Sequence, residues 1–240
     1  MYTETTPPLT DATILLVARE GNNRRLLSEW LSGEGFDVVV ADGPEGLPET
    51  YDLCLVDTTC FRQAKGELQE RRTAAQPVFL PHLLLLPATE AGRNQPDVTA
   101  LVDDVVELPA DQTSLRKRID NLLLTRQTAK QAKERTDLYQ ELVETMPDGL
   151  LLVDGEEIVY GNEAAARLLA VESKTDLAGH SVLDFVPPAE VAAVTSLLDG
   201  IRSDAREDTA LETTLESSTG ASVAVRLTGV TATYDGERMV

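Results

Sequence analysis

The segment DLCLVD, residues 52–57, indicates most clearly how the first half of the chain folds. Its apolar side chains form a continuous run instead of alternating with polar ones, which is typical of a strand buried on both faces. Four more short apolar segments occur in this half, namely TILLV at 13–17, FDVVVA at 36–41, HLLLL at 82–86 and VVEL at 105–108. Segments that favour helices separate several of them. This order predicts an α/β fold with a five-stranded parallel sheet that is doubly wound.

A long helical segment, residues 113–145, follows the predicted sheet. Its beginning carries an apolar stripe that can cover the sheet, whereas its middle offers only Ala129 and Ala132 as apolar contacts. The segment ends with Leu138, Leu142 and Val143. Because a coiled coil needs a continuous apolar seam, this weak centre leaves two interpretations open, a solvated linker helix and a dimeric coiled coil.

After the helix-breaking sequence MPDG at 146–149, the pattern changes to short strands and turns. LLLV at 150–153 and EIVY at 157–160 flank a turn signal at Asp154–Gly155, and two more strand-like segments follow. We therefore expect a second, α+β domain with an antiparallel sheet. The expected organisation is a flexible tail at 1–12, a first domain at 13–124, a linker helix at 125–145 and a second domain at 146–240 whose last strand continues past Val240.

The chain of 240 residues carries 41 Asp and Glu against 21 Lys and Arg, a formal net charge of −20. This charge disfavours binding to nucleic acids or anionic membranes, since both require clustered positive charge. A high net charge is also a means by which halophilic proteins stay soluble. The two Cys are too few for a disulfide framework or a four-Cys zinc site. With no apolar run long enough for a bilayer and a polar start, we expect a salt-adapted cytoplasmic protein.

Residues 13–124 resemble a response-regulator receiver domain of the flavodoxin type. The resemblance rests on ILLVARE at 14–20, LCLVDTT at 53–59, LLLLPA at 83–88 and VVELP at 105–109. It implies that a phosphoacceptor would fall on Asp57.

The other functional positions of receivers are not retained. The resemblance places the acidic pair on Ala18 and Arg19, the hydroxyl residue on Pro87 and the lysine on Leu108. Because carboxylates are needed to hold Mg²⁺ for phosphoryl transfer, we interpret the domain as a degenerate receiver without a metal site. We expect Asp57 to cap the following turn or to pair with Arg19.

The run LVETMPDGLLLVDGEEIVYGNEAAARLLAVESKTDLAGHSVLDFVPP, residues 142–188, resembles a PAS domain. The match rests on Asp148–Gly149, the segment 158–162, the Ala-rich segment 164–166, the turn Gly179–Ser181 and the predicted helix 188–201. Asn162 precedes the Ala-rich helix, so we expect its side chain to cap that helix.

The PAS resemblance implies an apolar cavity that could hold an unknown small apolar ligand. The side chains that we expect to line it are Leu168, Leu177, Val182, Phe185, Val194, Leu198, Leu211 and Val225. The alternative is that they pack as an ordinary core. No cofactor is predicted, since the domain has no Cys for covalent flavin attachment and only His180 could ligate a haem.

A degenerate receiver joined by a helix to a PAS domain resembles haloarchaeal HTR-like proteins, which are related to the sensor histidine kinases of two-component phosphorelays. The resemblance implies a sensory module without catalytic residues, with a protein partner or a homodimer held through the receiver-like face and the linker helix. The alternative is the input half of a histidine kinase or of a transcriptional regulator whose output domain lies beyond Val240. A nucleotide-binding enzyme is disfavoured, because the turn after Val17 offers only Gly21.

Overall fold

The computed structural model describes residues 11–90, 101–203, 210–234 and 236–240. The chain divides into two compact units, Met1–Thr136 and Asp137–Val240, which we call the amino-terminal and carboxy-terminal units. Most of the predicted tail, residues 1–10, lies outside the described residues.

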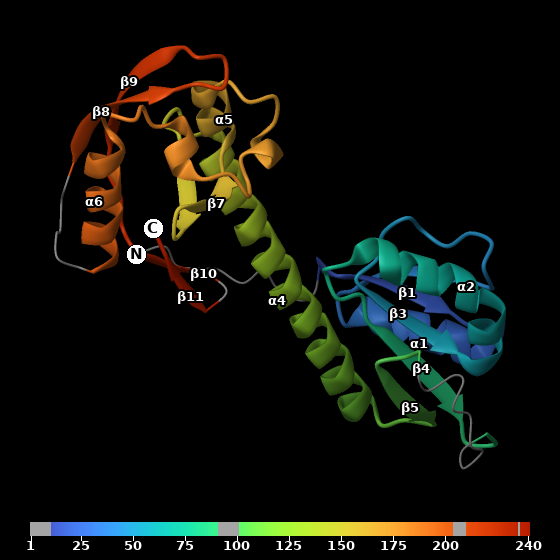
Figure 1. Ribbon diagram of the computed structural model, residues 1–240. Coiled ribbons are helices and arrows are strands. Elements are labelled where there is room, and N and C mark those ends of the chain that lie inside the picture. Colours follow the sequence, from blue (N-terminus) through green and yellow to red (C-terminus); the bar gives the residue numbers. More distant parts are fainter. Residues whose placement is uncertain (1–10, 91–100, 204–209, 235) are drawn as a thin grey trace. The chain divides into compact units, whose positions relative to one another are not determined.

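The amino-terminal unit contains a parallel sheet with the strand order β2-β1-β3-β4-β5 (Figure 1). This is the order of the flavodoxin-like doubly wound fold, so the predicted fold class is confirmed. The strands are β1 (Thr13–Val17), β2 (Asp37–Ala41), β3 (Leu53–Asp57), β4 (His82–Pro87) and β5 (Asp104–Leu108).

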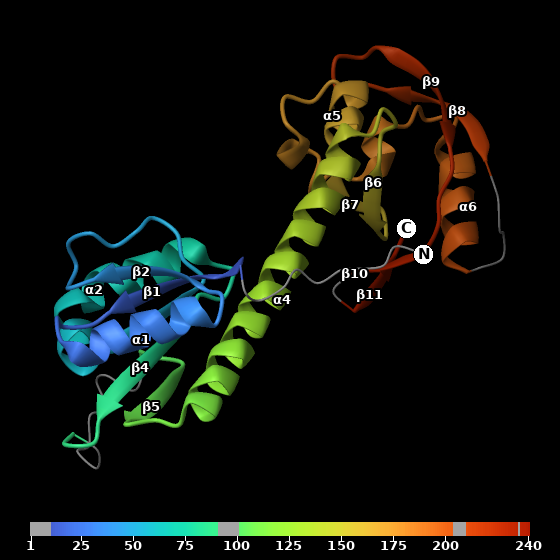
Figure 2. The ribbon, with the colours of Figure 1, turned by 180° about the vertical axis from the view of Figure 1, so that it is seen from behind.

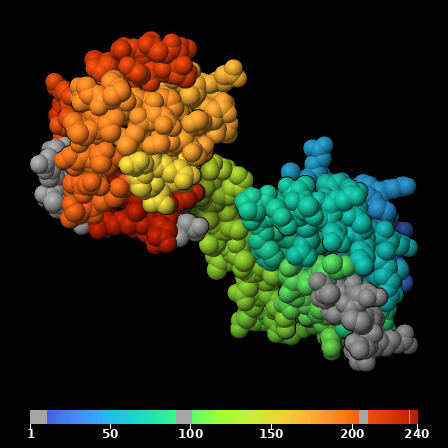
Figure 3. All heavy atoms as spheres, in the orientation of Figure 1, coloured from blue at the N-terminus to red at the C-terminus, as the bar shows by residue number. Residues whose placement is uncertain are grey.

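Helices cover both faces of this sheet, which is why its central strands are apolar throughout. Helix α1 (Asn22–Gly33) and the first part of α4 (Gln112–Thr145) pack on one face (Figure 2). Helix α2 (Thr58–Ala75) packs on the other, and its outer surface is the teal area of Figure 3. Side chains of β1 and β3 alternate between the two cores, so both faces of these strands are buried.

Among its described residues, the carboxy-terminal unit has three antiparallel strand pairs, two α-helices and the end of α4. The pairs are β6 (Leu151–Asp154) with β7 (Glu157–Gly161), β8 (Leu211–Glu216) with β9 (Ser222–Leu227), and β10 (Ala232–Tyr234) with β11 (Glu237–Met239). Val153 and Val240 exchange two backbone hydrogen bonds of 2.6 and 3.0 Å, which connects β6 to the residue after β11. Helices α5 (Glu163–Leu169) and α6 (Val191–Arg202) pack with these strands around one apolar core.

The turn between β6 and β7 lies one residue later than the sequence predicted. Asp154 pairs with Glu157, so the two loop residues are Gly155 and Glu156. Gly155 has a φ of 62°, a left-handed conformation that glycine adopts without steric cost.

Helix α4 is the long helix that the sequence predicted, with 34 residues. It is polar along much of its length, and in the described ranges of the chain no helix is both long and apolar enough to cross a membrane.

A buried arginine attaches α4 to the sheet. Arg126 is 9% exposed, and its guanidinium donates hydrogen bonds to the carbonyl oxygens of Tyr51 and Phe79, both at 2.9 Å, and to Asp52 Oδ1 at 3.0 Å. Asp52 also accepts from Lys130 Nζ at 2.6 Å and from the Thr13 backbone N–H at 3.1 Å. One side chain of α4 is therefore bonded to the residues that precede β3 and β4.

The charge of Asp52 is stabilised in this cluster. Burial raises the pKa of its carboxyl, but hydrogen bonds from Lys130, Arg126 and the Thr13 backbone outweigh burial and hold the pKa below its usual value. The carboxylate therefore stays ionised and balances the positive charge that Arg126 brings into the edge of the core.

Replacing Arg126 with glutamine should lower the free energy of unfolding of the amino-terminal unit by about 3 kcal/mol, because buried carbonyls and Asp52 lose their donor. The measurement is urea denaturation followed by the fluorescence of Trp30, the only tryptophan, which packs against the core on this face.

The matched control for Arg126 is Arg118→Gln on the same helix. Arg118 pairs with Asp104, and its side chain is 47% exposed, so its loss should cost less than about 1 kcal/mol. If both variants lost the same free energy of unfolding, the buried position of Arg126 would add nothing to stability.

Candidate functional site

Asp57 lies at the edge of the sheet where the parallel strands end. It is the N-cap of α2, where its Oδ1 accepts a hydrogen bond from the Cys60 backbone N–H at 2.7 Å. Its Oδ2 accepts from the Arg19 backbone N–H at 3.0 Å, and Arg19 Nε lies 3.6 Å from the same oxygen. Both roles that the sequence predicted for Asp57, the cap and the pair with Arg19, are present.

Protein donors thus occupy both carboxylate oxygens of Asp57. Burial raises the pKa of the carboxyl, but the hydrogen bonds from Cys60 and Arg19 outweigh burial and bring the pKa below its usual value. A phosphoryl group on Asp57 would have to share the carboxylate with these donors. That Asp57 is not phosphorylated stays a prediction, and this geometry favours it.

The surroundings of Asp57 do not fit the divalent cation that receiver chemistry implies. Ala18 offers no ligand atom, and the Arg19 guanidinium brings a positive charge next to the carboxylate. Pro87 and Leu108 end β4 and β5 and supply neither a hydroxyl nor an ammonium group. Within the described ranges, no three His, Cys, Asp or Glu side chains are grouped closely enough to hold a metal ion.

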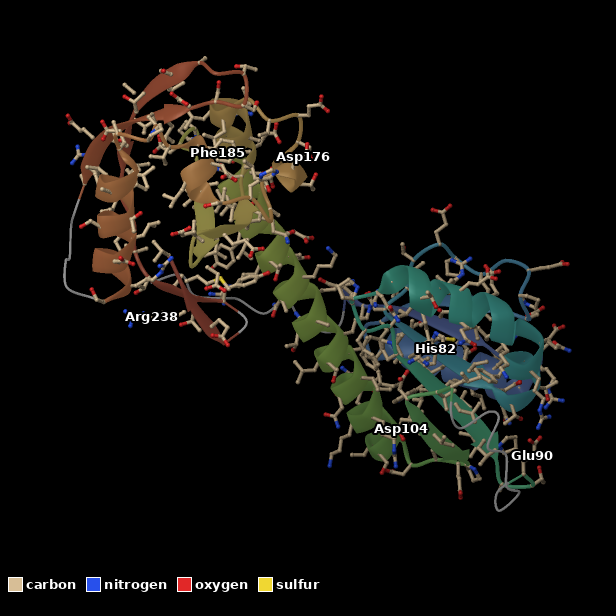
Figure 4. The ribbon with its side chains drawn as sticks, in the orientation of Figure 1. His82, Glu90, Asp104, Asp176, Phe185 and Arg238 are labelled. Carbon is tan, nitrogen blue, oxygen red and sulfur yellow. The ribbon has the colours of Figure 1, made fainter. Side chains whose placement is uncertain are left out.

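Seven of the eight side chains predicted to line the PAS cavity belong to one apolar cluster. Leu177, Phe185, Val194 and Leu198 are buried in it, and the half-buried members are Val182, Leu211 and Val225. Figure 4 labels Phe185 in the interior of this unit. The side chains pack against one another as a core, and the binding of a ligand among them stays a prediction.

Leu168 is the exception, since it is half-buried and not part of that cluster. The inward face of α5 is formed instead by Ala165, Ala166 and Leu169. Positions three and four residues apart share a helix face, as Ala166 and Ala165 do with Leu169, so moving one residue along exchanges a core position for a peripheral one.

Asn162 is completely buried, and its side chain forms four hydrogen bonds. Its Oδ1 accepts from the backbone N–H of Ala165 and of Leu150, both at 2.9 Å, so the predicted helix cap is confirmed. Its Nδ2 donates to the carbonyl oxygens of Val143 and Asp148, both at 3.0 Å. The amide therefore joins the end of α4, the following turn, the start of β6 and the start of α5.

Glu144, which the sequence did not single out, makes a second connection at the end of α4. It accepts hydrogen bonds from Tyr160 Oη at 2.7 Å, from the Glu163 backbone N–H at 3.1 Å and from Lys174 Nζ. Hydrogen bonds from Lys174 and Tyr160 lower the pKa of the Glu144 carboxyl, while burial and this carboxylate raise the pKa of Tyr160 to about 12.

Asn162→Asp should destabilise the carboxy-terminal unit by about 2 kcal/mol, because aspartate keeps the acceptor for Ala165 but leaves two buried carbonyls without a donor. Urea denaturation followed by circular dichroism measures the loss. The control is Asn22→Asp, the same change at an exposed residue, which should stay within about 0.5 kcal/mol. If Asn162→Asp were as stable as the control, the two donated bonds would contribute nothing.

We expect no Mg²⁺-dependent labelling of the protein by radiolabelled acetyl phosphate. The Arg19→Asp variant, which replaces the guanidinium with a carboxylate beside Asp57, should gain weak Mg²⁺ binding measurable by titration calorimetry. Wild-type labelling that disappears in Asp57→Asn would contradict the interpretation of this edge as inactive.

Comparisons with known proteins agree with this division of the chain. Residues 137–202 match the family model of the PAS domain, and no curated protein matches the chain. Three similar solved structures each cover about half of this chain. The PAS domain of an HTR-like protein from Haloarcula marismortui is 20% identical, covers 45% of this chain and 92% of that chain, and has a TM-score of 0.38. A PAS domain from a two-component sensor histidine kinase is 16% identical, covers 45% of this chain and 92% of that chain, and has a TM-score of 0.39. The receiver domain of the response regulator TorR of the TMAO respiratory system is 23% identical, covers 48% of this chain and 98% of that chain, and has a TM-score of 0.40.

The strand order of the amino-terminal unit is that of receiver-like folds, and residues 137–202 of the other unit match the family model of the PAS domain. These two features together indicate a signal-transduction module.

Proposed function

We propose that the protein is a non-enzymatic sensory module in which the PAS unit binds a small apolar molecule or dimerises, and the receiver-like unit binds a protein partner. The observation that carries this proposal is the state of Asp57. Its carboxylate serves as a helix cap and a partner of Arg19, in a place where phosphotransfer would require a free oxygen and a metal ion.

An apolar row at the end of α4 supports dimerisation through this helix. Leu138 and Leu142 lie in the last part of α4, and Met146 follows directly after its end, where its backbone N–H still donates to the Leu142 carbonyl oxygen at 3.1 Å. The three side chains are 54%, 49% and 43% exposed and follow one another at intervals of four residues. Residues at this spacing share one helix face, and a second copy of the chain would bury the row against the same row of its partner. The polar middle of α4 adds no such contacts, so we place the interface at this end.

The net charge of −20 opposes this association, since both copies repel each other. Salt screens that repulsion over about 8 Å at physiological ionic strength and over shorter distances in molar salt. The proposal that the chain is adapted to high salt therefore has a direct consequence, which is that the dimer should become more stable as salt is added.

The double variant Leu138→Glu/Leu142→Glu should raise the dimer dissociation constant by at least about tenfold, which corresponds to 1.4 kcal/mol. Sedimentation equilibrium in dilute buffer and in molar potassium chloride measures it, and wild-type affinity should be higher in salt.

The control is Leu124→Glu, the same change at a leucine of α4 that is 50% exposed and lies in the amino-terminal unit. A wild-type protein that stays monomeric in both buffers, or a control variant that dissociates as readily as the double variant, would refute this interface.

A further inference from the structure

The amino-terminal unit has a pocket at the edge of the sheet opposite to Asp57. Its volume is about 820 Å³, within the range of small-molecule sites. It lies between α2 and the segment that leads into β4, close to His82 at the start of that strand. Because β3 and β4 run parallel and Asp57 ends β3, the His82 end of the pocket and Asp57 are at opposite edges, while the pocket extends along α2 as far as Phe61.

The inner wall of the pocket is apolar and well packed. Phe61, Leu68 and Leu80 form its floor but are only 2%, 1% and 6% exposed, so the apolar surface open to a ligand comes mainly from the half-buried Val78 and Phe79. A wall of this kind suits an apolar body that includes a ring.

Two cations of α2 lie on the rim. Lys65 and Arg72 are seven residues apart and therefore project from the same side of the helix. Arg72 donates to the Leu101 carbonyl oxygen at 2.7 Å and to Asp103 Oδ1 at 2.9 Å, which offsets part of its charge. Lys65 is exposed and forms no ion pair within the described part of the chain.

His82 adds no positive charge to the pocket. It is 1% exposed, and its Nε2 shares a 3.0 Å hydrogen bond with Tyr51 Oη. Burial lowers the pKa of His82 to about 3, so the ring is neutral at physiological pH. The positive charge at this pocket therefore comes from the rim, in a chain that is strongly acidic as a whole.

We propose that this pocket binds a small molecule with an apolar, ring-containing body and a carboxylate. The body lies against Val78 and Phe79 over the buried floor, and the carboxylate meets Lys65 at the rim, beside Arg72. The site is separate from the cavity predicted in the PAS unit.

Hydrogen bonds connect two parts of the pocket wall to α4. Phe79 lines the pocket, and its carbonyl oxygen accepts from Arg126 of α4. His82, labelled in Figure 4, lines it too, and its partner Tyr51 also accepts from Arg126 through its carbonyl oxygen. Two parts of the wall are thus bonded to one side chain of the helix, so a ligand that shifts them changes the attachment of α4.

The test uses the full chain with 4-phenylbutyrate as the probe and 4-phenylbutan-1-ol as its uncharged counterpart, in titration calorimetry. The acid should bind about tenfold more tightly than the alcohol, because only the acid makes charge-assisted hydrogen bonds with the rim. Binding of the acid should also change the hydrogen exchange of backbone amides in α4 around Arg126.

Three variants, all at exposed residues, separate the site from general effects. Lys65→Gln should lower the affinity for the acid by about tenfold and leave the affinity for the alcohol unchanged. Lys117→Gln removes the same charge from α4 and should change neither probe, while Gln69→Trp at the rim should obstruct both.

The proposal is overturned if neither probe gives saturable binding, if acid and alcohol bind equally, or if Lys65→Gln and Lys117→Gln act alike. Saturable binding that survives Gln69→Trp would place the probe elsewhere and overturn it too. An unchanged exchange pattern in α4 would refute the connection through Arg126.

Discussion

The attachment of α4 by two buried polar side chains is the constraint on which the rest of the structure depends. The helix has too few apolar residues in its middle to be held by hydrophobic burial there. Arg126 bonds it to the residues before β3 and β4, and Asn162 bonds its last turn to the start of β6 and α5. Buried polar groups are costly unless they are bonded, and these two have several partners each.

Polar attachment has a consequence that apolar packing lacks. Hydrogen bonds are directional and short-ranged, so a rotation or an axial shift of α4 would lengthen or break the bonds from the Arg126 guanidinium to two carbonyls and a carboxylate. An apolar stripe tolerates small slips of a helix, because leucine contacts are adaptable. The two side chains thus set the register of α4 within each unit, and displacing either one would cost the desolvation of its partners.

The sequence predicted the features that depend on local pattern. The strands of the sheet were recognisable because burial on both faces demands continuous apolar runs such as residues 13–17, and the cap at Asn162 followed from its place before an Ala-rich helix. Only one of the four hydrogen bonds of Asn162 was predicted, since the other three involve backbone groups that come close in the folded unit. The sequence prediction places Leu168 in the cavity lining where the structure has Leu169, because the pattern of two adjacent leucines on a short helix does not reveal which one faces the core.

The sequence does not reveal features that depend on contacts between distant segments. Arg126 resembles any solvated arginine in a polar segment, although it lies seven residues after the buried Ile119 and thus on the same helix face. The pocket is lined by α2, by residues 76–82, which follow α2 directly, and by Leu101, and the local sequence pattern does not show how these segments fold against one another. Glu144 became notable only when Tyr160 and Lys174 were seen beside it.

Arg19 changes what the edge around Asp57 can do. A metal ion and a phosphoryl group arrive and leave, so a receiver with both can alternate between two electrostatic states. A guanidinium is always charged and is covalently part of the chain, so the pair of Arg19 and Asp57 has one state at any physiological pH. A change of conformation requires a ligand or partner that favours one state over another. On the proposal that Asp57 is inactive, a ligand of this unit acts away from Asp57, and the opposite edge holds the His82 end of the pocket and the hydrogen bonds that attach α4.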